Sequence, residues 1–311
     1  MRSGDWRDEP GGRRVAVTRP ARLRERYVRL RLRSASAWQR LPALPIQVGA
    51  LMRKRRAIGD YVVLDQDALR QTRRSDTLFI FGSGASLNEL RQSEWETIAK
   101  HDTLGFNWFV HERFVRCDYQ LLREITSDDR DRSTWMPELT EYAELIRTND
   151  NYAETVFLVQ SGLRATNSNR VIGYRLLPPG ARLFPWRTRV FRRELSRSLD
   201  AGLTHGYGTL GECINFGYLL GWRRIVLVGV DLYDRRYFWL ERDAVRTPDA
   251  LRGAEPGDRH ATAVPEMIAL LGEWADELAA EGVELSVQNP RSLLAGVLPV
   301  CDVGSLKRAP A

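Results

Sequence analysis

The chain has 311 residues, of which 43% are hydrophobic and 28% charged, a composition that is ordinary for a globular protein. It contains no run of about 18 apolar residues, so no membrane-spanning helix is expected. Its three cysteines are widely spaced and fit neither a disulfide framework nor a zinc site, which favours a reducing, cytoplasmic compartment.

The net charge of +7 comes from the start of the chain. Residues 1–75 hold 19 Lys and Arg against 7 Asp and Glu, whereas residues 76–311 hold 28 against 33. We therefore predict a basic N-terminal extension over residues 1–75. Within it, residues 21–40 alternate Arg with Leu, Tyr and Val, which fits a helix or a strand.

Two interpretations of residues 21–75 stay open. They bind an anionic membrane surface or an anionic partner, or they form a solvated basic segment that packs on the body. Nucleic-acid binding is disfavoured, because no recognised motif for it is present and the rest of the chain is acidic. The predicted location is accordingly cytoplasmic, with peripheral attachment to the inner face of the membrane as the first interpretation.

The compact domain is expected to begin near Asp76. Thr77–Phe81 is a hydrophobic strand that runs into Gly82-Ser83-Gly84-Ala85-Ser86, and Ser86 with Glu89 predicts a capped helix. Glycines allow a close approach of the backbone, and free N–H groups at a helix start favour an anion. The turn therefore predicts a phosphate site. The alternative is a tight turn without a ligand, since the third glycine of the dinucleotide fingerprint is absent.

Strands and helices alternate through the next part of the chain. The predicted strands are 103–109, 118–122, 155–159, 225–230 and 283–287, and the predicted helices are 135–147, 209–220 and 265–280. Residues 162–203 show no clear element, and residues 240–260 read as a lid that ends at His260. The alternation predicts an α/β fold with a doubly wound, mostly parallel sheet.

The most informative stretch is residues 204–239. Thr209 is predicted to be the N-cap of a helix, with Glu212 completing a capping box and Gly221 ending the helix. The strand that follows ends at Asp231, and two tyrosines, Tyr233 and Tyr237, come after it. Ligands of open α/β sheets bind beyond the carboxyl ends of strands, so a site is expected here. Simple packing of the two aromatic rings is the alternative.

Four blocks in order resemble the small bacterial sialyltransferases of glycosyltransferase family 42, over about residues 77–296. The blocks are Gly82–Leu90 (GSGASLNEL), Phe106-Asn107, Gly208–Tyr237 and Asn289–Ala295. This resemblance implies a single Rossmann-like, GT-A-like domain over residues 76–300, followed by a tail over 301–311.

The resemblance also implies an inverting, metal-independent transfer of sialic acid or a related nonulosonic acid from a CMP-sugar. The acceptor would be a hydroxyl of a glycan or glycolipid, in cell-surface glycan biosynthesis, and no cofactor is implied. Contacts to the nucleotide or donor would come from Gly82, Ser83, Gly84, Ser86, Asn107, Gly208, Thr209 and Asp231. Tyr233 and Tyr237 would assist departure of the phosphate, and His260 would be the base.

Some residues depart from the family pattern, namely Ser83, Trp108 and Arg123. These departures leave the donor sugar open, and they leave the acceptor contacts open with Arg123 and His205 as candidates. Two other functions remain: an ATP-dependent diphosphate transfer like that of pterin diphosphokinases, which requires Mg²⁺, and a non-catalytic nucleotide-binding module. Self-association is left open.

Overall fold

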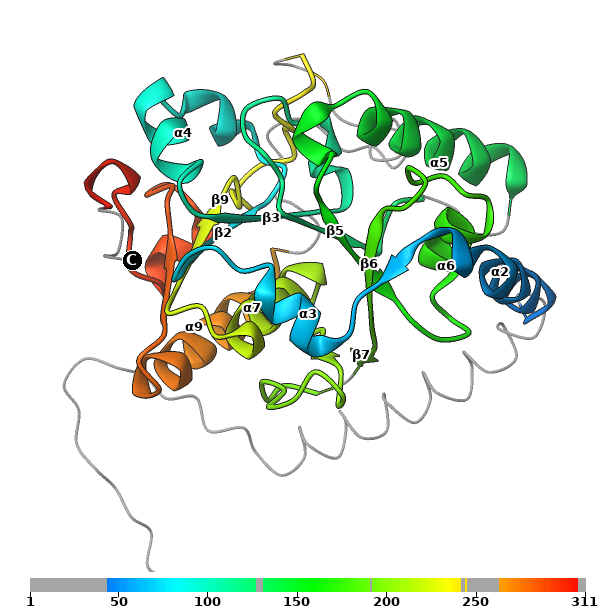
Figure 1. Ribbon diagram of the computed structural model, residues 1–311. Coiled ribbons are helices and arrows are strands. Elements are labelled where there is room, and N and C mark those ends of the chain that lie inside the picture. The colour runs from blue at the N-terminus through cyan, green and yellow to red at the C-terminus, as the bar shows by residue number, and fades with distance from the viewer. Residues whose placement is uncertain (1–43, 127–130, 191, 242–243, 245–262, 307–311) are drawn as a thin grey trace, which may run out of the picture. The chain divides into compact units, whose positions relative to one another are not determined.

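The computed structural model describes residues 44–126, 131–190, 192–241, 244 and 263–306 (Figure 1). The chain divides into two compact units, residues 1–45 and 46–311. Only Leu44 and Pro45 of the first unit are described, so the helix or strand expected at residues 21–40 lies outside the described residues.

An eight-stranded sheet forms the centre of the second unit, in the order β1-β6-β5-β4-β3-β2-β9-β10, and every neighbouring pair is parallel. Its strands are β1 (Val62–Val63), β2 (Thr77–Phe81), β3 (Asp102–Phe106), β4 (Tyr119–Leu122), β5 (Val156–Gln160), β6 (Arg182–Trp186), β9 (Arg224–Val228) and β10 (Glu284–Val287). A separate parallel pair is made of β7 (Thr188–Arg189) and β8 (Leu203–Thr204).

Helices cover both faces of the sheet (Figure 1). One face carries α3 (Gln66–Gln71), α7 (Thr209–Leu220) and α9 (Pro265–Ala280). The other carries α2 (Leu44–Ala57), α4 (Gln92–Ile98), α5 (Arg132–Arg147) and α6 (Thr166–Gly173). Short 3₁₀ helices are η2 (Ile58–Asp60), η3 (Ala85–Glu89), η4 (Asn107–His111), η5 (Asp150–Tyr152), η6 (Leu293–Gly296) and η7 (Val303–Ser305). The predicted doubly wound α/β fold is confirmed.

Alternation along the strands builds one core on each face. In β2, Leu78 and Ile80 join the core beneath α7 and α9, whereas Phe79 and Phe81 join the core beneath α4 and α5. Successive side chains of a strand point to opposite faces, and both faces are covered here. A strand buried on both sides must be apolar throughout, which is why the sequence signal for β2 was strong.

Two features of the fold differ from the sequence-based expectations. The domain begins before Asp76, because β1 pairs with β6 and Leu69 of α3 is fully buried. Residues 162–203 contain α6, β6 and β7. The sequence concealed α6, because Thr166–Arg170 is polar although every one of these residues is buried.

The topology fixes where a ligand site belongs. Strands β2 and β9 are neighbours, but β2 connects to β3 through α4 on one face, and α9 leads into β10 on the other. In open α/β sheets, ligands bind at such a switch point, outside the carboxyl ends of the two strands. The Gly-rich turn after β2 and Asp231 after β9 both lie at this point.

Candidate functional site

Two loops meet closely at the switch point. The backbone N–H of Gly82 donates to the Val228 carbonyl at 2.8 Å, and that of Gly84 donates to the Gly229 carbonyl at 2.8 Å. A Cβ on Gly82 would lie 2.4 Å from the Gly229 oxygen, and one on Gly84 would lie 2.3 Å from a carboxylate oxygen of Asp231. Both glycines are therefore required by the contact between the loops, whatever ligand the turn holds.

Asp231 ties the Gly-rich turn to the end of β9. Its carboxylate accepts from the Ser86 N–H at 3.0 Å, the Ser86 hydroxyl at 2.5 Å and the Asn289 amide at 2.8 Å. Ser86 and Asp231 are both buried. The prediction that Ser86 caps a helix is wrong, since the N-cap of η3 is Gly84 and the Ser86 hydroxyl binds Asp231 instead. Ser86 donates both its backbone N–H and its hydroxyl to the Asp231 carboxylate, and these two hydrogen bonds fix the shape of the turn.

Residues after β9 lie along the same turn. Tyr237 forms an antiparallel bridge with Gly84, and the Phe238 N–H donates to the Ser83 carbonyl at 3.2 Å. Asn88 secures this arrangement by donating to the Phe238 carbonyl at 2.8 Å. The turn and the tyrosine segment, about 150 positions apart in the chain, therefore form one surface.

Tyr233 is half-buried beside the switch point, with the guanidinium carbon of Arg291 5.9 Å from its ring centre. Burial and the nearby Asp231 carboxylate raise the pKa of the Tyr233 phenol. A phenol with a raised pKa stays protonated at neutral pH and can donate a hydrogen bond to an anion.

Asn107 links the ends of two further strands. It follows β3 directly, with a positive φ of 49°, a conformation that Asn tolerates better than most residues. Its side-chain oxygen accepts from the Glu124 N–H at 3.0 Å, and its backbone carbonyl accepts from Gln120 at 3.0 Å. The loop after β4, which carries Arg123, is thereby fixed beside β3.

The start of α7 differs from the prediction. Gly208 is the N-cap, Thr209 is the first helical residue, and the Thr209 hydroxyl has no hydrogen-bond partner among the described residues. Glu212 forms no capping box. Its carboxylate accepts instead from Arg123 and from the Thr188 hydroxyl at 2.9 Å, with His205 Nδ1 at 3.5 Å. A charged guanidinium is a stronger hydrogen-bond donor to a carboxylate than a backbone N–H, so the Glu212 side chain binds Arg123 and does not cap the helix.

Glu212 is the member of this group that the sequence analysis placed wrongly. It is fully buried, and burial raises the pKa of its carboxyl group although Arg123 and His205 act in the opposite direction. The signal in the sequence was a lone acid on a helix that is otherwise apolar and small. Thr188, which binds both Glu212 and Arg123, lies in a segment where no element was predicted.

The predicted site residues thus fall into two groups at the carboxyl ends of the strands. Gly82, Ser83, Gly84, Ser86, Asp231 and Tyr237 meet at β2 and β9, with Tyr233 beside them. Arg123, His205, Gly208 and Thr209 gather with Glu212 near β4 and α7, and Asn107 lies between. His260 and the predicted lid lie outside the described residues.

The carboxylates after β9 already have protein partners. Asp231 accepts three hydrogen bonds, and Asp234 is bound by the Arg236 N–H at 3.0 Å and its guanidinium at 2.6 Å. In the described part of the chain, no group of three or more His, Cys, Asp or Glu side chains is arranged to hold a metal ion.

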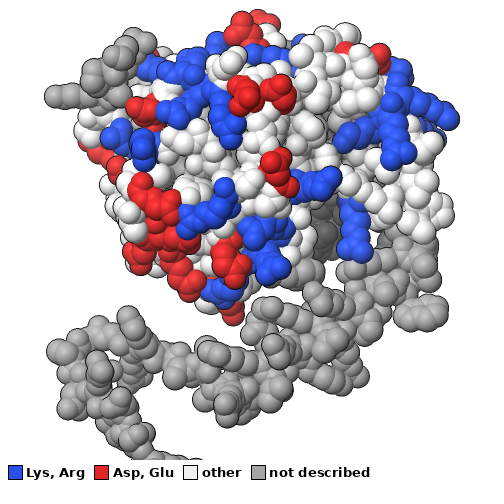
Figure 2. Space-filling model, turned by 60° about the horizontal axis from the view of Figure 1, so that its bottom comes forward, with Lys and Arg blue, Asp and Glu red and all other residues white. Residues whose placement is uncertain are grey.

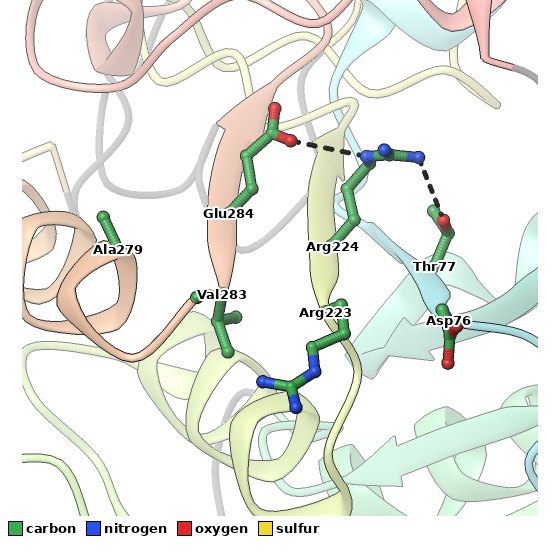
Figure 3. Close-up of a pocket in the computed structure, with 8 residues that line it drawn as sticks. Asp76, Thr77, Arg223, Arg224, Ala279, Val283 and Glu284 are labelled. Atoms are coloured by element: carbon green, nitrogen blue, oxygen red, sulfur yellow. Dashed lines mark hydrogen bonds and ion pairs between the residues drawn. The ribbon is translucent and has the colours of Figure 1, made fainter. Parts of the chain in front are cut away.

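A pocket of about 550 Å³ opens at the opposite edge of the sheet, at the amino ends of β2, β9 and β10 (Figure 3). Its charged side chains have protein partners: Asp76 pairs with Arg73, and Arg223 donates to the Glu281 carbonyl at 3.4 Å. Arg224 lies 3.4 Å from a Glu284 carboxylate oxygen and 3.4 Å from the Thr77 hydroxyl. These pairs leave the pocket without an oriented catalytic group, so the switch point is the better candidate.

No family model and no curated protein matches the chain. Among solved structures, the chain is similar to the monofunctional alpha-2,3-sialyltransferase Cst-I from Campylobacter jejuni, with 12% identity and a TM-score of 0.45 over 80% of this chain and 86% of that one. It is similar to the sialyltransferase CstII from Campylobacter jejuni in complex with cytidine-5'-monophosphate, with 17% identity and a TM-score of 0.40 over 73% and 85%.

A third similar structure is the MAf glycosyltransferase from Magnetospirillum magneticum AMB-1, with 15% identity and a TM-score of 0.45 over 77% of this chain and 38% of that one. The similar structures thus include bacterial sialyltransferases, the proteins that the four sequence blocks resemble. At these identities and TM-scores the similarity concerns the course of the chain and assigns no role to any residue.

Proposed function

We propose that this protein is a glycosyltransferase that moves sialic acid or a related nonulosonic acid from a CMP-sugar to a hydroxyl of a glycan or glycolipid. The transfer inverts the anomeric centre and needs no divalent metal. The supporting observation is the contact between the Gly-rich turn and the tyrosine segment: Tyr237 pairs with Gly84, and Asp231 holds Ser86. Two blocks that carry the family resemblance therefore share one surface at the switch point.

The turn supplies the nucleotide site in this proposal. The N–H groups of Gly82 and Gly84 donate to carbonyls at the end of β9, so we propose that the Ser83 N–H between them binds the phosphate or ribose. Ser86 with Asp231 keeps that backbone in place. Asn107, Gly208 and Thr209 lie further along the same edge and contact the donor.

The tyrosines supply the chemistry of departure. The phosphate of CMP gains negative charge as its bond to the anomeric carbon breaks, and phenol donors bind that charge more tightly in the transition state than before it. Tyr233 suits this role, because it is half-buried beside the switch point and a phenol keeps its proton at neutral pH. Tyr237 lies on the turn that would hold the same phosphate.

The acceptor hydroxyl requires a base as it attacks, and we propose His260 for that role. Histidine suits it, because its ordinary pKa of about 6.5 lies near neutral pH. His205 is the alternative, since it contacts Glu212 at the carboxyl edge. His260→Ala should abolish transfer and leave CMP affinity nearly unchanged, whereas a transfer-dead His205→Ala beside a fully active His260→Ala would reverse the assignment.

The diphosphate-transfer alternative is less well supported. It requires carboxylates that are free to hold Mg²⁺ at the ends of the strands. In the described part of the chain, the carboxylates that directly follow β9 are Asp231 and Asp234, and both accept hydrogen bonds from protein donors.

A donor screen tests the proposal. The protein is incubated with several CMP-sugars in EDTA, and release of CMP is measured. We expect the wild type to release CMP from at least one CMP-nonulosonic acid, and a Tyr233→Phe/Tyr237→Phe control to release it about 100- to 1000-fold more slowly. Absence of release from every CMP-sugar, with or without an acceptor, would reject the proposed reaction.

We further propose that residues 21–75 attach the enzyme to an anionic lipid surface. In α2, Leu44, Val48 and Met52 recur at a spacing of four, and 42%, 43% and 44% of their surfaces are exposed. The last turn of the same helix is basic, with Lys54, Arg55 and Arg56. An apolar stripe beside basic residues fits a lipid interface, where each Lys or Arg contributes about 1 kcal/mol.

The face drawn in Figure 2 has a different pattern. Figure 2 shows basic and acidic side chains interspersed over one face, and surface pairs such as Arg193 with Glu273 at 3.2 Å neutralise each other. None of the helices in the described part of the chain has the length and apolar content of a membrane span. The proposed attachment is therefore peripheral.

Flotation with vesicles tests this attachment. The full chain should float with phosphatidylglycerol vesicles and not with phosphatidylcholine vesicles. Val48→Ser/Met52→Ser should float less than Val297→Ser/Val300→Ser, a matched control with two exposed valines outside residues 21–75. Equal flotation of the full chain with the two kinds of vesicle, or equal flotation of Val48→Ser/Met52→Ser and its control, would contradict the proposal.

A further inference from the structure

Arg123 is anchored from behind by buried groups. It follows β4 directly, and its Nη1 donates to the Glu212 carboxylate and to the Thr188 hydroxyl at 3.0 Å. Glu212 has no exposed side-chain surface, whereas 15% of the Arg123 side chain is exposed. Thr188 is itself held by the Gln160 amide at 2.6 Å. The guanidinium therefore reaches the protein surface in a fixed position.

Part of the guanidinium is left for another acceptor. Its Nη2 donates to no residue in the described part of the chain, and its Nε lies 3.6 Å from the exposed Glu124 carboxylate, beyond hydrogen-bond distance. A guanidinium has five N–H groups in a planar fork that matches the two oxygens of a carboxylate or phosphate. The outer edge of Arg123 can bind one such group.

Stability alone explains the buried pair poorly. Removing a carboxylate from water is costly, and a buried ion pair often contributes little to net stability. Glu212 also keeps one carboxylate oxygen, Oε2, without a partner among the described residues. Holding Arg123 in one orientation is a function that would justify this cost.

Position in the sheet decides which anion Arg123 would meet. Neighbouring strands lie about 4.8 Å apart, so the ends of β2 and β4 are separated by about 10 Å. A nucleotide phosphate at the turn after β2 is thus too far along the edge. In the proposed function the donor site runs from the turn past Asn107, whose side chain holds the loop that carries Arg123, so an acidic group on the sugar would be the anion within reach.

We propose that Arg123 binds the carboxylate of an acidic sugar donor, and that Glu212 is the residue that positions it. This assignment rests on the proposed function and adds its sugar specificity: Arg123 selects donors that carry a carboxylate over uncharged sugars.

Calorimetric titration with three probes tests the assignment: CMP, CMP-3-fluoro-N-acetylneuraminic acid and the methyl ester of that compound. The wild type should bind the acid more tightly than the ester. Arg123→Gln should weaken binding of the acid about 10- to 100-fold, as for loss of hydrogen bonds to a charged group, and leave CMP binding unchanged. Arg123→Lys keeps the positive charge but loses the planar fork of N–H groups. Its affinity for the acid should lie between those of the wild type and Arg123→Gln.

Two further variants separate positioning from stability. Glu212→Gln should reduce the ratio of acid to ester affinity, whereas a purely structural role would lower the melting temperature and leave that ratio unchanged. Arg224→Gln is the matched control, because Arg224 is also paired with a glutamate, at the opposite edge of the sheet. It should not alter the ratio.

The outcomes distinguish the two proposals. Equal affinity of the wild type for acid and ester, or an unchanged ratio in Arg123→Gln, would overturn the role of Arg123 while CMP binding upholds the nucleotide site. Failure of all three probes to bind would overturn both.

Discussion

Two clusters of buried carboxylates, Asp102 with Asp118 at the amino edge of the sheet and Glu212 at the carboxyl edge, are hydrogen-bonded differently. At the amino edge, Asp102 accepts from the backbone N–H groups of Arg74 and Ser75 at 3.0 and 2.9 Å and from the Trp222 indole at 2.8 Å. Its neighbour Asp118 accepts from Arg74 and Arg116, at 2.6 and 2.7 Å. At the carboxyl edge, one carboxylate oxygen of Glu212 has no hydrogen-bond partner among the described residues. The Thr209 hydroxyl has none there either.

This difference separates stability from function. A fully hydrogen-bonded buried network stabilises and fixes the fold, whereas an incompletely satisfied one is costly and needs another reason to persist. The network of Asp102 and Asp118 thus fastens β2, β3 and β4 together, and we propose that the Glu212 cluster is kept for binding a ligand. The predictions below test this division, beginning with the largest effect.

Loss of both phenols at the switch point should have the largest effect. Tyr233→Phe/Tyr237→Phe should lower kcat for transfer about 100- to 1000-fold, by analogy with loss of an oxyanion donor. The melting temperature should change little, because only two oxygens are removed. Full activity in the double variant would show that the tyrosines pack and do not react.

Asp102→Ala should lower the free energy of unfolding by about 3–5 kcal/mol, because it leaves several buried donors without an acceptor. CMP affinity of the folded variant should stay that of the wild type. Denaturant unfolding and calorimetry measure the two quantities. Asp67→Ala is the control, because the Asp67 side chain is 89% exposed. An equal loss of stability in Asp67→Ala would show that the buried network of Asp102 has no special role in stability.

Ser86→Ala should lower the free energy of unfolding by about 2 kcal/mol, the usual value for a hydrogen bond to a charged group. It should also weaken CMP binding, because the turn loses one of its ties to Asp231. If stability falls and CMP affinity is unchanged, the Gly-rich turn is structural only.

The smallest effect is a pH dependence at Glu212. Burial raises the pKa of its carboxyl group above the ordinary 4.5, so the folded protein binds the proton more tightly than the unfolded chain does. The protonated Glu212 carboxyl contributes its full stabilisation of the fold below pH 4.5. This stabilisation is lost as the pH rises through the pKa of Glu212 in the folded protein. The wild type should therefore lose stability relative to Glu212→Gln over this rise, as thermal melts at several pH values can measure. A difference in melting temperature between the wild type and Glu212→Gln that does not change with pH would contradict the raised pKa of Glu212.

The sequence was sufficient for most of the fold, because β2 and β9 are buried on both faces and read as apolar runs. It was not sufficient for α6, which is buried although several of its residues are polar. It was not sufficient for β1 either, because a strand of two residues has no recognisable pattern. At the site, the spacing of blocks placed the Gly-rich turn, Asp231 and the tyrosines correctly at the carboxyl ends. Side-chain partners were missed at Ser86, Thr209 and Glu212, because local capping rules do not include acceptors or cations from distant strands.

The central claim is that the switch point binds CMP without a metal. Calorimetric titration of the full chain with CMP in EDTA, and with ATP in the presence and absence of Mg²⁺, tests it most directly. Binding of CMP in EDTA, with unchanged affinity on addition of Mg²⁺, is the predicted result. Binding of ATP only with Mg²⁺, and none of CMP, would contradict the claim and support diphosphate transfer instead.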